Sequence, residues 1–140
     1  MKLPNPLIPG FNPDPSIVRV GEDYYLATST FEYLPGVPIY HSKDLINWSL
    51  IGHVVTRVGQ LQFAGVPTGG GAWAPTIRFH DGLFYVVITD AMGRGTLIFT
   101  AENPAGPWSD GVLTDIDGID PDLAWTADGT CYMTFSGLIL

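Results

Sequence analysis

The sequence has few cations, and it has no long apolar segment. Of its 140 residues, 14 are Asp or Glu and only 6 are Lys or Arg, and the cations are scattered rather than clustered. Nucleic acids and anionic membrane surfaces bind to clustered positive charge, so neither is expected as a partner. No stretch reaches the roughly 20 apolar residues of a membrane-spanning helix.

Cysteine is almost absent. Cys131 stands alone, so the sequence can form neither an internal disulfide nor a thiolate metal site. Its neighbours Thr130 and Tyr132 are typical of a strand, and we expect Cys131 to be a small buried apolar residue.

The first ten residues contain three prolines and no apolar run of the kind found in a signal peptide. This favours a cytoplasmic location.

Short runs rich in Val, Ile, Tyr, Phe and Thr predict an all-β protein. Gly, Pro, Asn and Asp separate these runs, which is the pattern of strands joined by turns. The turns at Gly21-Glu22 and Asp81-Gly82 predict hairpins between antiparallel neighbours. The expected strands are residues 16–20, 24–29, 39–41, 76–80, 84–89, 96–100, 123–126 and 130–135.

An internal repeat organises these strands. Three similar segments begin the units, and each is followed by a turn and an aromatic strand: Asp14-Pro15-Ser16-Ile17, Ala74-Pro75-Thr76-Ile77 and Asp120-Pro121-Asp122-Leu123. The spacing from Pro15 to Trp48 is 33 positions, and the spacing from Pro75 to Trp108 is also 33. Trp48 and Trp108 therefore occupy equivalent positions, where we expect core packing.

The repeat length predicts a β-propeller. Units of 60 and 46 residues match a four-stranded blade with its loops. We expect units over residues 14–73, 74–119 and 120–140, the last incomplete, so that the chain supplies about two and a third blades. Because propellers need about 4–8 blades to close, residues 1–140 are expected to form the N-terminal part of one propeller domain. The alternative is a complete small β-sandwich with an accidental repeat.

Two aspartates occupy equivalent positions in this repeat. Hydrolysis of a glycosidic bond uses two carboxyl groups across the bond. Equivalent strand starts in a propeller point to one central axis, so Asp14 and Asp120 are expected to converge there, while Ala74 leaves space. The residue before a proline is normally held extended, which would aim each carboxylate. A lone Asp-Pro would be only a turn starter.

Aromatic residues flank these positions. Phe31, Tyr33 and Trp73 lie in loops beside the strand starts. A sugar presents an apolar face that stacks on aromatic rings, so Phe31 and Trp73 are candidate binding residues; the alternative is core packing.

No metal or cofactor is expected. The Asp115–Asp120 segment departs from the calcium-loop pattern, because its Gly is at the fourth position and Thr126 stands at the twelfth. Gly69-Gly70-Gly71 lacks the Lys-Ser or Lys-Thr of a phosphate loop. The three histidines lack the spacing of a zinc site.

Four segments, in order along the chain, resemble glycoside hydrolase family 43, and most closely its β-xylosidase and α-L-arabinofuranosidase branch. They are Phe11-Asn12-Pro13-Asp14-Pro15-Ser16, residues 29–45 with Ser-Thr-Phe-Glu-Tyr-Leu-Pro-Gly at their start, Trp73-Ala74-Pro75-Thr76-Ile77-Arg78 and Gly118-Ile119-Asp120-Pro121-Asp122-Leu123.

The resemblance implies a five-bladed propeller and an inverting mechanism acting on oligosaccharides. Asp14 would be the general base, and Asp120 would tune the pKa and the orientation of the general acid. Phe31, Trp73 and Ala74 would line the subsite for the terminal sugar. The family's acid is a Glu of the third blade beyond Leu140, and Glu22, Glu32 and Glu102 do not match its motif. We therefore expect the isolated chain to be inactive or nearly so.

Other functions stay open at this point. The sugar could differ, as in a galactan- or arabinan-directed glycosidase, and the choice between xylose and arabinose rests partly on later blades. The propeller could bind carbohydrate without catalysis. A pure interaction propeller gives no reason for Asp14 and Asp120 to recur. The oligomeric state is left open.

Overall fold

The computed structural model describes residues 3–137, which form ten β-strands and no helix. Within that range there is accordingly no helix that is long and apolar enough to cross a membrane. The strands are β1 (Ser16–Val20), β2 (Asp23–Ala27), β3 (Gly36–Ser42), β4 (Ser49–Val55), β5 (Thr76–His80), β6 (Leu83–Asp90), β7 (Gly95–Ala101), β8 (Val112–Leu113), β9 (Ile119–Trp125) and β10 (Cys131–Ser136).

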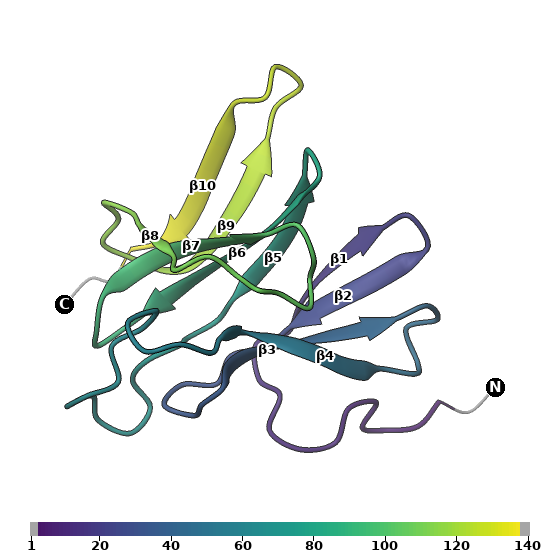
Figure 1. The fold of residues 1–140 in the computed structure, drawn as a ribbon, viewed down its shortest axis with the longest axis horizontal. Coiled ribbons are helices and arrows are strands. Elements are labelled where there is room, and N and C mark those ends of the chain that lie inside the picture. The colour runs from purple at the N-terminus through teal and green to yellow at the C-terminus, as the bar shows by residue number, and fades with distance from the viewer. Residues whose placement is uncertain (1–2, 138–140) are drawn as a thin grey trace.

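The strands form two four-stranded antiparallel sheets and one two-stranded sheet (Figure 1). Within each sheet the strands follow one another in chain order, β1 to β4, β5 to β8, and β9 with β10. The first two sheets lie inside the first two repeat units expected from the sequence, and the third begins one residue before the expected boundary, at Ile119. The third unit is described as far as residue 137. The predicted all-β fold with two complete blades and the start of a third is confirmed.

Two strands, β4 and β8, were not predicted from the sequence. β4 contains Gly52 and begins directly after Trp48, the last residue of the matched spacing, and β8 has only two residues. Both predicted hairpins are confirmed, since Val20 pairs with Asp23 and His80 pairs with Leu83 across their turns.

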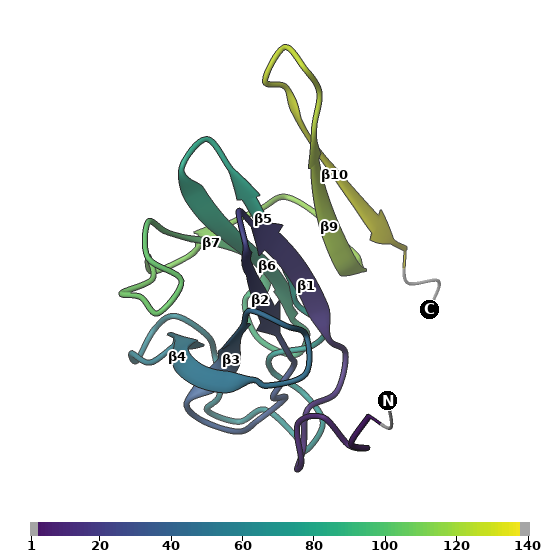
Figure 2. The same cartoon turned by 90° about the vertical axis from the view of Figure 1, so that its right-hand side faces the viewer.

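The first strands of the three sheets lie next to one another. β5 contacts both β1 and β9, and the three run in the same direction in the ribbon (Figures 1 and 2). This arrangement is that of the inner strands of propeller blades, whose starts share one end of the molecule.

The core lies between the first two sheets. Ile39 and Val54 of the first sheet belong to one buried cluster with Ile77, Val86 and Phe99 of the second. The sheets approach so closely that a Cβ on Gly52 would stand 2.5 Å from the carbonyl oxygen of Ala105. Trp108 is buried in this core as predicted, whereas Trp48 is only half-buried.

The predicted burial of Cys131 is wrong, because this residue is exposed. Cys131 begins β10, which pairs with β9 alone in the described chain. A strand of a two-stranded sheet has one open edge and little covering its faces, so a small apolar residue there stays in contact with solvent.

Candidate active site at the starts of the inner strands

The two repeated aspartates lie at the starts of the first and the third inner strand. Asp14 precedes β1 by two residues, and Asp120 is the second residue of β9. β5 lies between β1 and β9, preceded by Ala74 at the equivalent position. Both aspartates are exposed, so each carboxylate is accessible to water and substrate. Their catalytic roles stay predictions.

Hydrogen bonds fix the order of the inner strands. The backbone N–H of Ile77 in β5 donates to the hydroxyl of Ser16 in β1 at 3.1 Å. The guanidinium of Arg78 in β5 donates to the carboxylate of Asp122 in β9 at 2.7 Å. β5 is thereby tied to both of its neighbours.

The backbone at both aspartates differs from the expected extended form. Asp14 has φ +54° and Asp120 has φ +53°, both in the left-handed region. Asp tolerates this region better than most residues because its side chain is short and polar. Ala74, at the same repeat position, does not share the positive φ. Backbone strain of this kind gathers at functional sites. Here Asp14, Asp120 and the candidate binding residue Phe31 share it, as do three residues elsewhere, Val37, Leu45 and Asp81.

The carboxylate of Asp14 is held by a buried hydroxyl. The Ser29 side chain, in the segment after β2, donates to Asp14 Oδ2 at 2.5 Å. The backbone N–H of Ser29 donates to the carbonyl of Pro13 at 3.0 Å. Tyr40 of β3 donates from its hydroxyl to Asn12 Oδ1 at 2.6 Å. The turn that carries Asp14 is therefore held by hydrogen bonds from two elements, the segment after β2 and strand β3.

An aromatic group stands beside this turn. The rings of Phe11 and Phe31 are 6.0 Å apart, and those of Phe11 and Tyr33 are 5.8 Å apart in an edge-to-face arrangement. Phe11 is 60% exposed and Tyr33 is 59% exposed. The sequence analysis did not identify Phe11 as a binding residue, although it stands three positions before Asp14.

Phe31 and Trp73 are brought together by their backbones. Phe31 and Ala72 exchange two hydrogen bonds, of 2.8 and 2.9 Å. Trp73 follows Ala72, donates its backbone N–H to the carbonyl of Thr89 at 3.0 Å and donates its indole N–H to the carbonyl of Gly69 at 2.7 Å. The two predicted sugar-binding residues are thus carried on paired segments. Phe31 and Trp73 are each only half-buried, as is Ala74.

The carboxylate of Asp120 is held differently from that of Asp14. Among the described residues no side-chain hydrogen bond reaches it; instead the segment before it is tied at the carbonyl of Gly118. The buried hydroxyls of Thr89 and Thr96 lie 3.3 and 3.4 Å from this carbonyl oxygen. The second blade thereby positions the start of β9.

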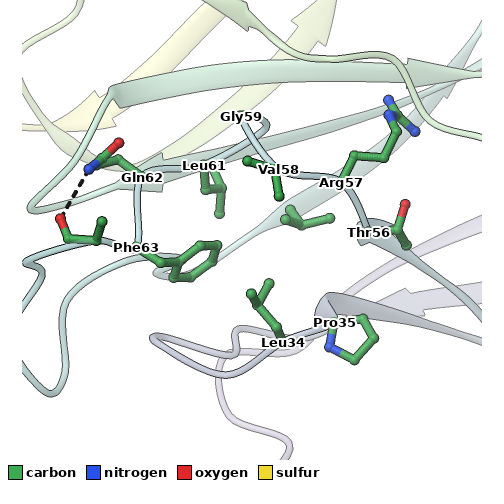
Figure 3. Close-up of a pocket in the computed structure, with 11 residues that line it drawn as sticks. Leu34, Pro35, Thr56, Arg57, Val58, Gly59, Leu61, Gln62 and Phe63 are labelled. Atoms are coloured by element: carbon green, nitrogen blue, oxygen red, sulfur yellow. Dashed lines mark hydrogen bonds between the residues drawn. The ribbon is translucent and has the colours of Figure 1, made fainter.

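An apolar cavity of about 530 Å³ lies apart from these residues (Figure 3). The side chains of Leu34, Val58, Leu61 and Phe63 face one another across it, and none of the predicted site residues lines it. Because it has no acidic residue in its lining, it cannot supply the carboxyl pair that glycoside hydrolysis uses.

In residues 3–137 no three His, Cys, Asp or Glu side chains are grouped so that they could hold a metal ion.

Known proteins are similar to this chain in both sequence and fold. The family described as glycosyl hydrolases family 43 matches residues 3–139. A non-reducing end α-L-arabinofuranosidase of Bacteroides ovatus is 52% identical over 91% of this chain and 25% of its own length. A β-xylosidase of Bacillus subtilis is 45% identical over 95% of this chain and 26% of its own length.

Solved structures agree with the sequence matches. The Bacteroides ovatus xyloglucan-locus GH43B structure superposes with a TM-score of 0.89 at 50% identity, covering 94% of this chain and 27% of that one. A xylan β-1,4-xylosidase of Bacillus halodurans gives a TM-score of 0.89 at 45% identity, with 94% and 27% covered.

The sheets are blades of the five-bladed β-propeller that these neighbours share. The chain belongs to glycosyl hydrolases family 43. It spans about a quarter of the length of the curated relatives it matches.

Proposed function

We propose that this chain forms the first blades of an inverting glycoside hydrolase that releases terminal xylose or arabinose from xylan- or arabinan-derived oligosaccharides. One observation carries the proposal: an exposed aspartate, Asp14, is held in a strained turn by a buried hydroxyl beside half-exposed aromatic residues. Family membership supports the reaction class, and the names of the relatives support both sugars.

Asp14 acts as the general base in this proposal. An inverting enzyme activates a water with one carboxylate while a carboxylic acid protonates the leaving oxygen from the other side, and the two groups stand roughly 6.5–9.5 Å apart. Asp14 is exposed, so a water can reach it. The carboxylate must be ionised to accept the proton of that water.

Asp120 acts on the general acid. An acid must keep its proton near neutral pH to donate it, and a neighbouring carboxylate raises its pKa by like-charge repulsion. Asp120 is exposed at the start of β9, on the third blade, where the resemblance places the acid. Phe31, Trp73 and Ala74 receive the terminal sugar in the proposal, with the rings supplying apolar stacking surfaces.

The 140 residues contain no glutamate suited to be the acid. Glu22 lies in the exposed turn between β1 and β2, and Glu102 is exposed just after β7. Glu32 accepts the backbone N–H of Gly69 at 3.0 Å, so it braces the loop before Trp73. We therefore propose that the isolated chain has little or no hydrolytic activity.

The second candidate is a propeller that binds carbohydrate without cleaving it. The exposed rings of Phe11 and Tyr33 favour this function, because aromatic surfaces hold sugars whether or not an acid is present. It differs from the first candidate only in the lack of turnover.

The test is hydrolysis of aryl β-D-xyloside and aryl α-L-arabinofuranoside by the 140-residue chain and by the chain continued to the length of its relatives. We expect turnover only in the longer protein, and an Asp14→Ala variant should lose it. Oligosaccharide binding without turnover in the longer protein would favour the carbohydrate-binding propeller. Turnover by the 140 residues alone would contradict the missing acid.

A further inference from the structure

We propose that Ser29 is a positioning residue, which aims the carboxylate of the general base through a hydrogen bond to Asp14. The inference rests on the proposed function, since it matters only if Asp14 activates a water. Within residues 3–137 the Ser29 hydroxyl has hydrogen-bond contacts only with the carboxylate of Asp14 and the carbonyl of Pro13.

The hairpin register places Ser29 opposite Asp14. Val20 pairs with Asp23 at the turn, and Ser16 pairs with Ala27 at the other end of the ladder. Two residues beyond Ser16 and two beyond Ala27 are Asp14 and Ser29, just outside this ladder. The backbone N–H of Ser29 donates to the carbonyl of Pro13, one residue before Asp14, at 3.0 Å, so the two segments are still joined beside Asp14.

Ser29 is a rigid support for an exposed group. Its relative exposure is 0%, whereas Asp14 is exposed. An exposed aspartate can rotate about its side-chain bonds, and a hydroxyl fixed by burial restricts that rotation. Hydrogen bonds to an ionised acceptor are stronger than those between neutral groups. The 2.5 Å contact from Ser29 Oγ to Asp14 Oδ2 therefore defines where the other carboxylate oxygen points.

A second anchor acts on the same turn. The Tyr40 hydroxyl donates to Asn12 at 2.6 Å, and the Asn12 amide in turn donates to the carbonyl of Pro9 at 3.3 Å. A non-glycine residue with positive φ persists only where its surroundings over-determine it. Asn12 fixes the chain before Asp14, and Ser29 fixes the side chain itself.

The second blade shows what happens where the carboxylate is absent. Ala74 and Thr89 occupy the positions that correspond to Asp14 and Ser29, as the register from Thr76 and Val87 shows. Without a carboxylate opposite it, the Thr89 hydroxyl turns to Thr96 at 3.1 Å and to the carbonyl of Gly118 at 3.3 Å. The hydroxyl position is repeated, and only the first blade aims it at a carboxylate.

The experiment compares Ser29→Ala with a matched control in the chain continued to the length of its relatives, using an aryl glycoside that the wild type cleaves. The control is Thr28→Val, which removes the neighbouring buried hydroxyl; this hydroxyl has no hydrogen-bond partner in the described chain. We expect Ser29→Ala to lower kcat about 10- to 100-fold with KM changed less than about threefold. Thr28→Val should change kcat less than about twofold.

A double-mutant cycle separates positioning from general support of the fold. In an Asp14→Ala background there is no carboxylate to aim, so Ser29→Ala should change the residual rate less than about twofold. A loss in that background equal to the loss in the wild type would overturn the proposal, as would equal effects of Ser29→Ala and Thr28→Val.

Two further results make the test decisive. If Ser29→Ala does not fold, Ser29→Cys replaces it; a thiol is a weaker donor, so an intermediate loss of kcat is expected, and wild-type kcat would overturn the proposal. If Asp14→Ala keeps the wild-type rate, the proposed function fails, and the role of Ser29 fails with it. Loss in Asp14→Ala but not in the Ser29 variants overturns only the role of Ser29.

Discussion

The turn that carries Asp14 and the turn that carries Asp120 have nearly the same backbone but different supports. Both aspartates are exposed, precede a proline and have φ near +54°. Asp14 receives a hydroxyl directly on its carboxylate, whereas the segment before Asp120 is tied by its backbone to the second blade. Repetition of a motif therefore reproduces the chain path but leaves the fixing of the side chain to neighbouring residues.

This difference suits the two proposed roles. A general base has to hold a water at one defined position, and small displacements of a reacting group are costly. A residue that tunes the pKa of a neighbour acts through its charge, which varies slowly with position. The directly held carboxylate is the one to which we assign the base.

The largest expected effect comes from neutralising each aspartate in the chain continued to the length of its relatives. Asp14→Asn should lower kcat about 10³-fold, because general-base catalysis is worth about 10²–10⁴-fold. Asp120→Asn should cost less and should move the alkaline limb of the pH–rate profile to lower pH, because loss of a like charge lowers the pKa of the acid. Steady-state rates from pH 4 to 9 check this, and a larger loss in Asp120→Asn would break the comparison.

A substitution at the contact between the first two blades should destabilise the fold. Gly52→Ala places a methyl group 2.5 Å from the Ala105 carbonyl oxygen, and such overpacking costs about 2–3 kcal/mol of unfolding free energy. Gly21→Ala is the control, since open space surrounds it and only its φ of +62° is unfavourable; about 1 kcal/mol is expected. Urea unfolding measures both, and equal losses would contradict the close approach.

The backbone support of Asp120 should be weaker than the packing between the blades. Thr96→Val removes a buried hydroxyl that contacts Thr89 and Gly118, and a typical buried hydrogen bond is worth about 1 kcal/mol. Thr28→Val removes a buried hydroxyl without a partner in the described chain, so it should cost less. Urea midpoints compare the two, and the reverse order would show that Gly118 is not held in this way.

The smallest expected effect is a change in how stability depends on pH, and it concerns Asp44 in the loop between β3 and β4. Hydrogen bonds from Asn47, first from its backbone N–H and then from its side chain, hold the pKa of Asp44 well below its usual value, and the Ile46 N–H adds to them. A lowered carboxyl pKa stabilises the fold above the unfolded value near 4, and this contribution is lost as pH falls through the folded value.

Asp44→Ala should therefore reduce the fall in melting temperature between about pH 5 and pH 2. Thermal unfolding followed by circular dichroism at several pH values measures it. The variant should leave the pH–rate profile unchanged, since Asp44 lies in the loop between β3 and β4. An identical fall in wild type and variant would show that these hydrogen bonds do not favour the ionised carboxylate.

The sequence was sufficient to predict the blades because their signal is repeated. The spacing from Pro15 to Trp48 recurs from Pro75 to Trp108, and the turns at Gly21 and Gly82 mark the hairpins. β4 and β8 were missed because outer strands lack a repeated motif of their own, and β8 is very short.

The fine structure of the site was less predictable. The rule for residues before proline predicted an extended Asp14 and was wrong, because local rules omit the neighbours that hold a strained turn. Ser29 had a signal that could have been used: counting six residues back from Val20 and six on from Asp23 places Asp14 opposite Ser29. Contacts between blades, such as Thr96 with Gly118, had no such signal.

The exposure of Cys131 has a practical consequence. It is the single thiol of the sequence and stands on β10, the open edge of the third sheet. Desolvation by the atoms around the thiol raises its pKa although the residue is exposed, so a maleimide or disulfide reagent will react faster as the pH is raised. In the 140-residue chain the thiol can be labelled, and in a longer chain its protection would report when another strand has been added beside β10. The labelling rate of this one residue thus measures whether the blade has been completed.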